Sequence, residues 1–421
     1  MVKVSIDFCA TPMNPVGAGR YVLELASNLV GLKSEDDFVF IAKKGDSRVD
    51  EIIEYELGKR NDEEAITRIE GAGASQERNP RDNVRFRDLE LEKFNLARRQ
   101  FRCLQVSPNN TALRLIYEQV GFPRVLSNEG IDVHHSPHYT MPVFAKVPII
   151  VTIHDTTFIE NPQWHLRRKV LMFRKYLSYA AKHASAIVAV SEVVKRNIEK
   201  LLNPKCEVVV IPHGVDLETF NPSESRPGLD ESVLKLLDIN EPYLLYVGTL
   251  EPRKNIESLI EGFLQLKRCK KIDQDFKLIL AGRDGWKISN LNSMIKESRD
   301  VLKLGYVKEE YLPTLMRRSK GVIYPSLEEG FGLPALETLS VGVPLVVVKG
   351  SVMAGLAGRA SFCAQTGSSN DIAAAIEEAL DKIESRQRID LGKTVAQGYS
   401  WKKSAQLHLD LYRKVALGMK S

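Results

Sequence analysis

Segments with the apolar pattern of buried strands alternate with segments of helical periodicity along most of this 421-residue chain, and this alternation constrains the fold most. The predicted strands form two series, the first at 2–7, 38–42, 132–135, 147–153, 186–191 and 208–211, the second at 244–247, 277–281, 301–304, 321–324 and 344–348. Predicted helices separate most of them, at 19–32, 168–183, 193–201, 256–268, 290–298, 309–319, 336–340 and 371–385. Such alternation predicts an α/β fold with parallel sheets.

The break between the two series falls at the turn-rich segment 212–216, Pro-His-Gly-Val-Asp. We therefore predict two doubly wound, Rossmann-like domains, the first covering residues 1–214 and the second residues 215–399. A last helix, 400–421, is predicted to begin after Ser400, whose hydroxyl suits the N-cap position. The chain is long enough for each domain to bury a core of its own.

Composition places the chain among globular proteins of a reducing compartment. The residues are 43% hydrophobic and 27% charged, and the net charge is +5, which argues against a disordered chain. No apolar run approaches the about 20 residues of a membrane span, and the N-terminus leads into a predicted strand without the pattern of a signal peptide. The five cysteines show no paired spacing, so we expect neither disulfides nor a zinc site, and a cytoplasmic protein.

The most informative motif is Glu-Gly-Phe-Gly-Leu-Pro-Ala-Leu-Glu at 329–337, a glycine loop between a predicted strand and a predicted helix. Pro334 suits the first helical position. In that geometry the free N–H groups and the positive end of the helix dipole favour a diphosphate over the loop. Glu329 and Glu337 flank the loop and can accept hydrogen bonds from hydroxyl groups. The motif thus predicts a nucleotide-sugar site, although a purely structural glycine turn gives the same local pattern.

A second motif lies upstream, Val-Gly-Thr-Leu-Glu-Pro-Arg-Lys-Asn at 247–255. Arg253 and Lys254 follow a predicted strand, and doubly wound sheets bind ligands at the carboxyl ends of their strands. Both cations can neutralise a diphosphate. The alternative is that they are solvated residues that open a helix, and the glutamate loop downstream favours the binding function.

These two motifs, together with Thr-Ile-His-Asp at 152–155, resemble those of the retaining glycosyltransferases of family four. The most similar branch is that of the bacterial mannosyltransferases of O-antigen and other surface polysaccharides. The likeness covers the chain from about residue 130 to its end, and the first thirty residues. The resemblance implies a GT-B fold, in which two Rossmann-like domains face each other across a cleft. It also implies that the last helix returns to the first, acceptor-side domain, and that the second domain binds the nucleotide sugar.

The resemblance also implies roles for individual residues. His154 is expected to face the donor sugar, Lys254 and Arg253 the diphosphate, Glu329 the sugar hydroxyls and Glu337 the ribose. Further residues implied to contact the donor are Gly17, Gly19, Val307, Phe331, Gly332 and Leu333. Those expected on the acceptor side are Arg20, His138 and Tyr139.

The expected reaction transfers a hexose with retention, from a nucleoside diphosphate sugar to a glycan or lipid-linked oligosaccharide. No Asp-x-Asp pair is expected against the diphosphate, and His134, His135 and His138 have no carboxylate at convincing spacing. We therefore expect no cofactor and no tightly bound metal. GDP-mannose is the donor that the resemblance favours, with UDP- and dTDP-sugars left open.

Several features bear on rival functions. Gly17-Ala-Gly19 looks like a dinucleotide fingerprint, but Val22 replaces its third glycine and the loop lies too far from the strand, so we reject a dehydrogenase. Thr249 replaces an arginine found in many family members. Ala354 and Gly355 stand where the family has proline and glutamate, which leaves open a catalytically weak, nucleotide-sugar-binding partner of another glycosyltransferase.

The basic segment 93–102 raises the question of a membrane partner. If it is one helix, Phe94 and Phe101 lie on the same face, and basic amphipathic helices bind anionic lipid surfaces. The basic residues are Lys93, Arg98, Arg99 and Arg102. A helix packed on its own domain is the alternative, and without a binding motif we expect no nucleic-acid partner.

Overall fold

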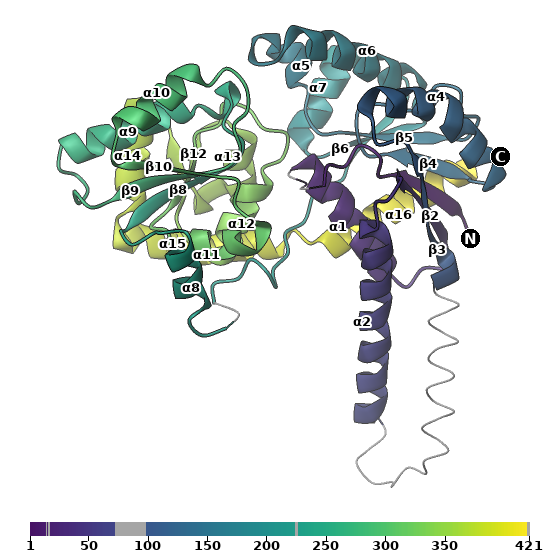
Figure 1. Ribbon diagram of the computed structural model, residues 1–421, viewed down its shortest axis with the longest axis horizontal. Helices are drawn as coiled ribbons and strands as arrows, with labels where there is room; N and C mark the ends of the chain where they lie inside the picture. Colours follow the sequence, from purple (N-terminus) through teal and green to yellow (C-terminus); the bar gives the residue numbers. More distant parts are fainter. Residues whose placement is uncertain (14, 16, 72–97, 224–225, 419–421) are drawn as a thin grey trace. The chain divides into compact units, whose positions relative to one another are not determined.

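The computed structural model describes residues 1–418 except 14, 16, 72–97 and 224–225, and within residues 60–71 it describes the backbone alone (Figure 1). The chain divides into two compact units. The first consists of Met1–Ile159, Arg167–Pro212 and the residues from Trp401 onward. The second consists of Glu160–Leu166 and His213–Ser400.

The first unit is built on a seven-stranded parallel sheet of order β3-β2-β1-β4-β5-β6-β7. Its strands are β1 (Lys3–Asp7), β2 (Asp37–Lys43), β3 (Phe101–Ser107), β4 (Val133–Ser136), β5 (Ile149–Ile153), β6 (Ala186–Ala189) and β7 (Glu207–Val210). The order runs outward from β1 in both directions, so the sheet has its topological switch point between β1 and β4. Ligands of doubly wound sheets bind at the carboxyl ends of the strands at such a point.

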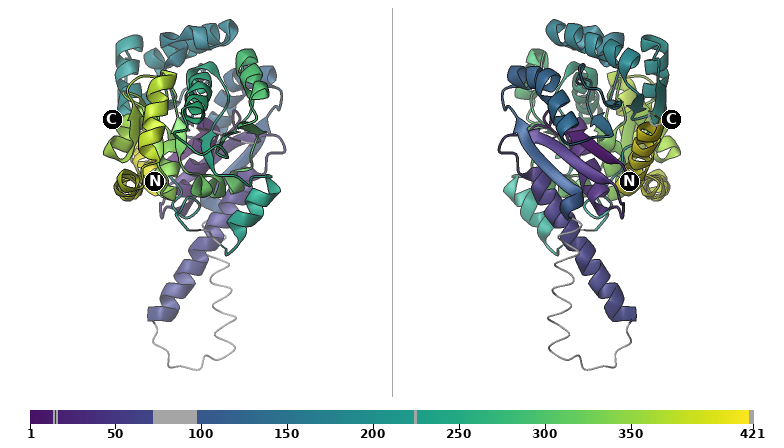
Figure 2. Two further views of the ribbon diagram at one scale, coloured as in Figure 1. Left: turned by 90° about the vertical axis from the view of Figure 1, so that its left-hand side faces the viewer. Right: turned by 90° about the vertical axis from the view of Figure 1, so that its right-hand side faces the viewer.

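Helices cover both faces of this sheet (Figures 1 and 2). They are α1 (Ala18–Gly31), α2 (Arg48–Gly71), α4 (Thr111–Asn128), α5 (Thr157–Glu160), α6 (Arg167–His183), α7 (Glu192–Leu202) and α16 (Trp401–Gly418). The C-terminal helix α16 packs on α1, and a buried network fixes it there. In this network, the Tyr21 hydroxyl lies 2.8 Å from Nε2 of His408, and the Tyr412 hydroxyl lies 2.7 Å from Nδ1 of His135.

The second unit is built on a six-stranded parallel sheet of order β10-β9-β8-β11-β12-β13. Its strands are β8 (Tyr243–Val247), β9 (Lys277–Ala281), β10 (Val301–Gly305), β11 (Val322–Tyr324), β12 (Leu345–Val348) and β13 (Phe362–Ala364). Its helices are η1 (Pro162–Trp164), α8 (Leu229–Leu236), η2 (Pro252–Lys254), α9 (Ile256–Arg268), α10 (Ser289–Glu297), η3 (Glu309–Tyr311), α11 (Leu312–Arg318), α12 (Leu333–Val341), α13 (Val352–Ala357), η4 (Gly358–Ala360), α14 (Ser369–Ala379) and α15 (Lys382–Gln397). The switch point of this sheet lies between β8 and β11, the two strands that precede the sequence motifs.

A short segment from the first half of the chain, 160–166, packs with the second unit. The Trp286 indole donates a hydrogen bond to the Trp164 carbonyl, and Nζ of Lys287 donates to the Gln163 carbonyl at 2.7 Å. The Asn161 amide donates to the Glu328 carboxylate at 2.7 Å. The sequence pattern does not predict that 160–166 packs with the second unit. The two residues that donate to its carbonyls lie more than 120 residues further along the chain.

The structure confirms the predicted α/β class with parallel sheets, and it corrects two details. The predicted helix 371–385 is two helices, because the Asp381 side chain caps a new N-terminus by accepting from the N–H groups of Ile383 and Glu384. Strands β3 and β13 and helices α2, α4, α5, α8 and α13 were not predicted.

The prediction of a single helix over 93–102 is wrong at its C-terminal end. Phe101 is fully buried as the first residue of β3, so it cannot share a helical face with Phe94. Arg98 pairs with Asp50 at 2.9 Å, and the Arg102 guanidinium bonds Glu129 at 2.6 Å. Lys93 and Phe94 lie outside the described residues. Of the helices that the structure describes, none has the length and apolar content needed to cross a bilayer.

Candidate active site

The predicted phosphate-binding cations and the first glutamate of the glycine loop meet in the second unit. Lys254, the last residue of η2, contacts Oε1 of Glu329 through its Nζ. Nη1 of Arg253 donates to Oε2 of Glu329 at 2.9 Å, while its Nε lies 2.6 Å from Oε1 of Glu251. The four side chains are between 4% and 18% exposed. They form a charge-balanced cluster, which we call the Lys254–Glu329 cluster.

Electrostatics keep this cluster ionised. Burial alone would raise the pKa of Glu329, but the charges of Lys254 and Arg253 and their hydrogen bonds lower it to about 2. Burial lowers the pKa of Lys254, and the charge of Glu329 opposes that shift. Glu329 is therefore ionised at neutral pH, and its charge favours the protonated form of Lys254.

Hydrogen bonds to backbone carbonyls hold the two motifs together. Nη1 of Arg253 also donates to the carbonyl of Glu328 at 3.0 Å, and the N–H of Leu327 donates to the carbonyl of Arg253 at 3.0 Å. Asn255 adopts a left-handed conformation (φ 54°), which turns the chain from η2 into α9. Residues on two separate strand ends thus form one fixed surface.

The glycine loop leads into α12 as predicted, with Pro334 in its first turn. Gly332 has a φ of 103°, and a Cβ there would lie 2.7 Å from Cγ of Met353, so only glycine fits. Phe331 and Leu333 are buried, and the Phe331 ring packs against His213 with centroids 4.8 Å apart. These two side chains therefore stabilise the loop. In the first turn of α12 only the N–H of Leu333 is left for a ligand, because Pro334 has no N–H and those of Ala335 and Leu336 donate to the Gly332 carbonyl.

The other residues of this unit that were predicted to contact the donor are largely buried. Glu337 is 2% exposed in α12, beside Tyr324. Burial first, and then the charge of Glu337, raises the pKa of Tyr324. Val307 follows β10 and is also largely buried. The Arg283 guanidinium stacks 4.3 Å from the centroid of Tyr306. The assigned roles of Glu337 and Val307 stay predictions.

The positions where the chain departs from the family pattern lie in α13 and after β8. Gly355 is in α13, and a Cβ added there would meet no atom within 4 Å, so the space for a larger side chain exists. Thr249 accepts a hydrogen bond from the Tyr246 hydroxyl through its carbonyl, at 3.1 Å. The chain does contain an Asp-x-Asp sequence, Asp273-Gln274-Asp275, but it precedes β9, at the opposite end of that strand from the ligand-binding edge.

In the first unit, His154 directly follows β5. Its Nε2 donates to the carbonyl of Pro137 at 2.9 Å, and its ring packs edge-on against Tyr21 with centroids 5.2 Å apart. Burial lowers the pKa of His154, so the ring is neutral, with its proton on Nε2. The structure thus fixes the ring orientation and tautomer of this residue.

The glycines before α1 differ in what they require. Gly17 precedes the helix with a φ of 52°, a conformation that favours glycine. A Cβ on Gly19 would lie 2.8 Å from Cβ of Pro15, so glycine lets the loop pack on the helix. Arg20 lies beside them in the first turn of α1 and is half-buried.

The three histidines between residues 134 and 138 have different partners. His134 lies 2.8 Å from the Ser5 hydroxyl through Nδ1, and His135 joins the network that fixes α16. His138 lies 3.2 Å from Oδ2 of Asp7, and Tyr139 packs its ring against Phe173. A carboxylate does therefore lie close to these histidines, that of Asp7 on a strand distant in sequence.

Comparison with known proteins identifies the family. Residues 15–219 match the model described as Glycosyltransferase Family 4, and residues 234–392 match that of glycosyl transferases group 1. The chain belongs to the family 4 glycosyltransferases. Among its relatives, O-antigen chain mannosyltransferase B of Escherichia coli is 29% identical over 289 residues, 67% of this chain and 74% of the relative.

Two further comparisons complete the picture. The serotype-specific mannosyltransferase WbdA of E. coli is 27% identical over 61% of this glycosyltransferase, which spans only 32% of that longer protein. The crystal structure of Anabaena HepE in complex with UDP-glucose superposes with a TM-score of 0.66, at 16% identity, over the whole of both chains. These matches confirm the predicted GT-B fold class and the assignment as a glycosyltransferase.

Proposed function

We propose that this glycosyltransferase transfers mannose from GDP-mannose, with retention, to a glycan or lipid-linked oligosaccharide during bacterial surface-polysaccharide synthesis. The reaction takes place in the cytoplasm, at the inner face of the membrane for a lipid-linked acceptor. The observation that carries the proposal is the Lys254–Glu329 cluster beside the N-terminus of α12. It combines two cations for a leaving diphosphate with a carboxylate for sugar hydroxyls.

Charge balance explains how the cluster receives its substrate. In the structure, Lys254 and Arg253 are bonded to Glu329. A diphosphate carries more negative charge than one carboxylate and competes for both cations. Its binding frees Glu329 to accept hydrogen bonds from the sugar. As the bond between sugar and diphosphate breaks, the two cations and the positive N-terminal end of α12 stabilise the growing negative charge on the phosphate. The diphosphate therefore needs no metal ion at this point.

The choice of donor and acceptor rests on the relatives. The two E. coli proteins are named as mannosyltransferases, and one of them as acting on the O-antigen chain. HepE, with its bound UDP-glucose, shares only the fold, so UDP- and dTDP-sugars are the competing donors.

Calorimetric titration of the purified protein with GDP-mannose, UDP-glucose and a dTDP-sugar tests the donor. We expect the tightest binding for GDP-mannose, unchanged when manganese is added. Turnover is measured in parallel, with the anomeric configuration of the product read by NMR. Tighter binding of another nucleotide, or an inverted product, would refute the respective part of the proposal.

The same experiment tests the alternative of a nucleotide-sugar-binding partner without activity of its own. Binding of GDP-mannose without any turnover on lipid-linked or free mannosyl acceptors would favour that alternative. The altered α13, with Gly355 in place of the usual glutamate, is the observation that keeps it open.

A further inference from the structure

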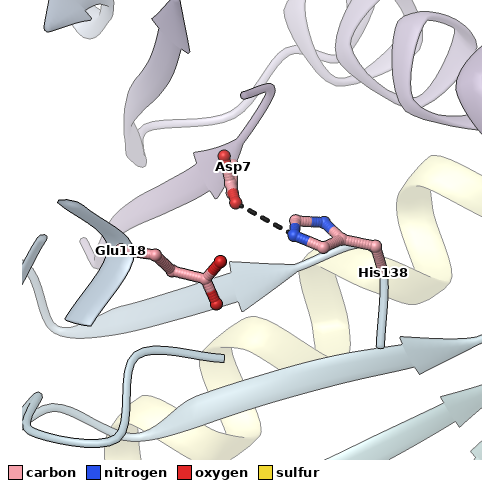
Figure 3. A group of neighbouring side chains, drawn as sticks. All are labelled: Asp7, Glu118 and His138. Carbon is pink, nitrogen blue, oxygen red and sulfur yellow. Dashed lines mark ion pairs between the residues drawn. The ribbon is translucent and has the colours of Figure 1, made fainter. Parts of the chain in front are cut away.

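Three metal-ligating side chains meet in the first unit, away from the residues assigned to the reaction chemistry. Asp7 is the last residue of β1, His138 follows β4 by two residues, and Glu118 lies on α4. One ligand atom from each lies within 4.8 Å of the others. Figure 3 shows the three side chains pointing toward a common space, with the ion pair between Asp7 and His138 marked.

Each carboxylate has one satisfied oxygen and one that points into this space. Oδ1 of Asp7 accepts from the N–H of Cys9 at 2.7 Å, and Oε2 of Glu118 accepts from the Thr140 hydroxyl at 2.9 Å. Among the described residues, Oε1 of Glu118 has no hydrogen-bond partner, and Oδ2 of Asp7 has only the imidazole at 3.2 Å. Both residues are 1% exposed. A buried carboxylate oxygen without a partner is costly, which points to an occupant that the protein does not supply.

The negative charge of the two carboxylates also favours a bound cation. In the described part of the chain, the two buried carboxylates face the Arg114 guanidinium, which lies 3.5 Å from Oε2 of Glu118, and the His138 imidazole, which lies 3.2 Å from Oδ2 of Asp7. A divalent ion between the three side chains would compensate both carboxylates at once.

The cluster also lies where this fold places ligands. Asp7 lies at the carboxyl end of β1 and His138 just beyond that of β4, and these are the two strands at the switch point of the seven-stranded sheet. His138 has a side chain that is 17% exposed, which leaves the cluster one side toward solvent.

We propose that Asp7, Glu118 and His138 bind one divalent metal ion of the Zn²⁺ or Mn²⁺ class. One imidazole nitrogen with two carboxylate oxygens is a donor set that suits borderline divalent ions. Three protein ligands leave at least one coordination position for water or for a substrate oxygen. The site uses none of the residues assigned to the donor diphosphate, so metal binding can be measured without assuming the proposed mannose transfer.

The test measures metal binding directly. The full-length protein is freed of metal with a chelator, dialysed, and titrated with Zn²⁺, Mn²⁺ and, as a hard-ion control, Mg²⁺. We expect one equivalent of Zn²⁺ or Mn²⁺ to bind and to raise the melting temperature, with Mg²⁺ at least tenfold weaker. His138→Gln and Glu118→Gln keep the size of the side chains and are each expected to weaken binding at least a hundredfold.

Matched variants exclude incidental binding. His183 and Cys269 are exposed, so His183→Gln and Cys269→Ser are expected to bind the ion as the wild type does. Circular dichroism verifies that each variant is folded, and if His138→Gln is not, Glu118→Gln decides. The proposal is overturned if wild type binds no equivalent, if Glu118→Gln binds like wild type, or if either control variant abolishes binding.

Discussion

Replacing Lys254 with alanine should lower kcat about a hundredfold, which corresponds to about 3 kcal/mol of lost transition-state stabilisation. The Lys254 side chain is 14% exposed and lies at the carboxyl end of β8, in contact with Glu329. In a site this enclosed, water replaces a missing cation poorly, so the negative charge that develops on the departing diphosphate stays uncompensated.

The fold of this variant should survive, because Arg253 retains its contacts. Arg253 still bonds Glu329, Glu251 and the carbonyl of Glu328, so no buried carboxylate of the cluster is left without a cation. The loss in unfolding free energy should therefore stay below the about 3–5 kcal/mol typical of removing the sole partner of a buried charge.

Initial rates with radiolabelled GDP-mannose give kcat and KM separately, and a thermal melt is recorded on the same sample. Lys271→Ala is the matched control, because Lys271 pairs with Glu377 on the surface of the same unit. An unchanged kcat in Lys254→Ala, or an equal loss in both variants, would refute the assigned role of Lys254.

Three further predictions follow from the geometry. Gly332→Ala should lower stability by about 1–3 kcal/mol, because its positive φ and the nearby Met353 both oppose a Cβ; equal melting temperatures would contradict this. Burial lowers the pKa of His408 from 6.5 to about 4, so the unfolded state takes up a proton first as the pH falls below 6.5. Stability should then decline toward pH 4 by up to about 3 kcal/mol, a decline that urea titrations should find smaller in His408→Gln. Gly355→Glu should fold normally, since the added side chain enters open space, and should alter donor affinity or turnover; calorimetry that shows neither would mean that this position does not contact the donor.

Elements with strong local patterns were predictable, and those defined by distant partners were not. β8 and β11 are apolar runs followed by turn residues, and the structure contains both. β3 was missed because Phe101 continues from a basic segment and pairs with Phe38 of β2, a partner that only the folded sheet supplies. The break between α14 and α15 depends on one capping side chain, that of Asp381, inside an otherwise helical pattern.

The same distinction applies to the candidate sites. Lys254 and Glu329 are 75 residues apart, yet their proximity follows from the sequence because each residue sits in a recognisable motif at a strand end. The contact partner Glu251 was missed, although it lies in the same motif, because nothing local shows which way its side chain turns. The salt bridge between Arg253 and Glu251 becomes visible only with the turn of η2 in place.

Part of the Asp7–Glu118–His138 cluster could have been predicted from the sheet topology alone. β8 and β11 are neighbours at the switch point of one sheet, with Leu245 opposite Val322, and β1 and β4 are neighbours at the switch point of the other. The rule that brings Lys254 to Glu329 therefore also brings Asp7 to His138. The sequence did not predict this cluster, because Asp7 lies in no recognisable motif and because α4, which carries Glu118, was not predicted. Carboxylates at the strand ends of a predicted switch point are thus worth testing against each histidine that follows the neighbouring strand.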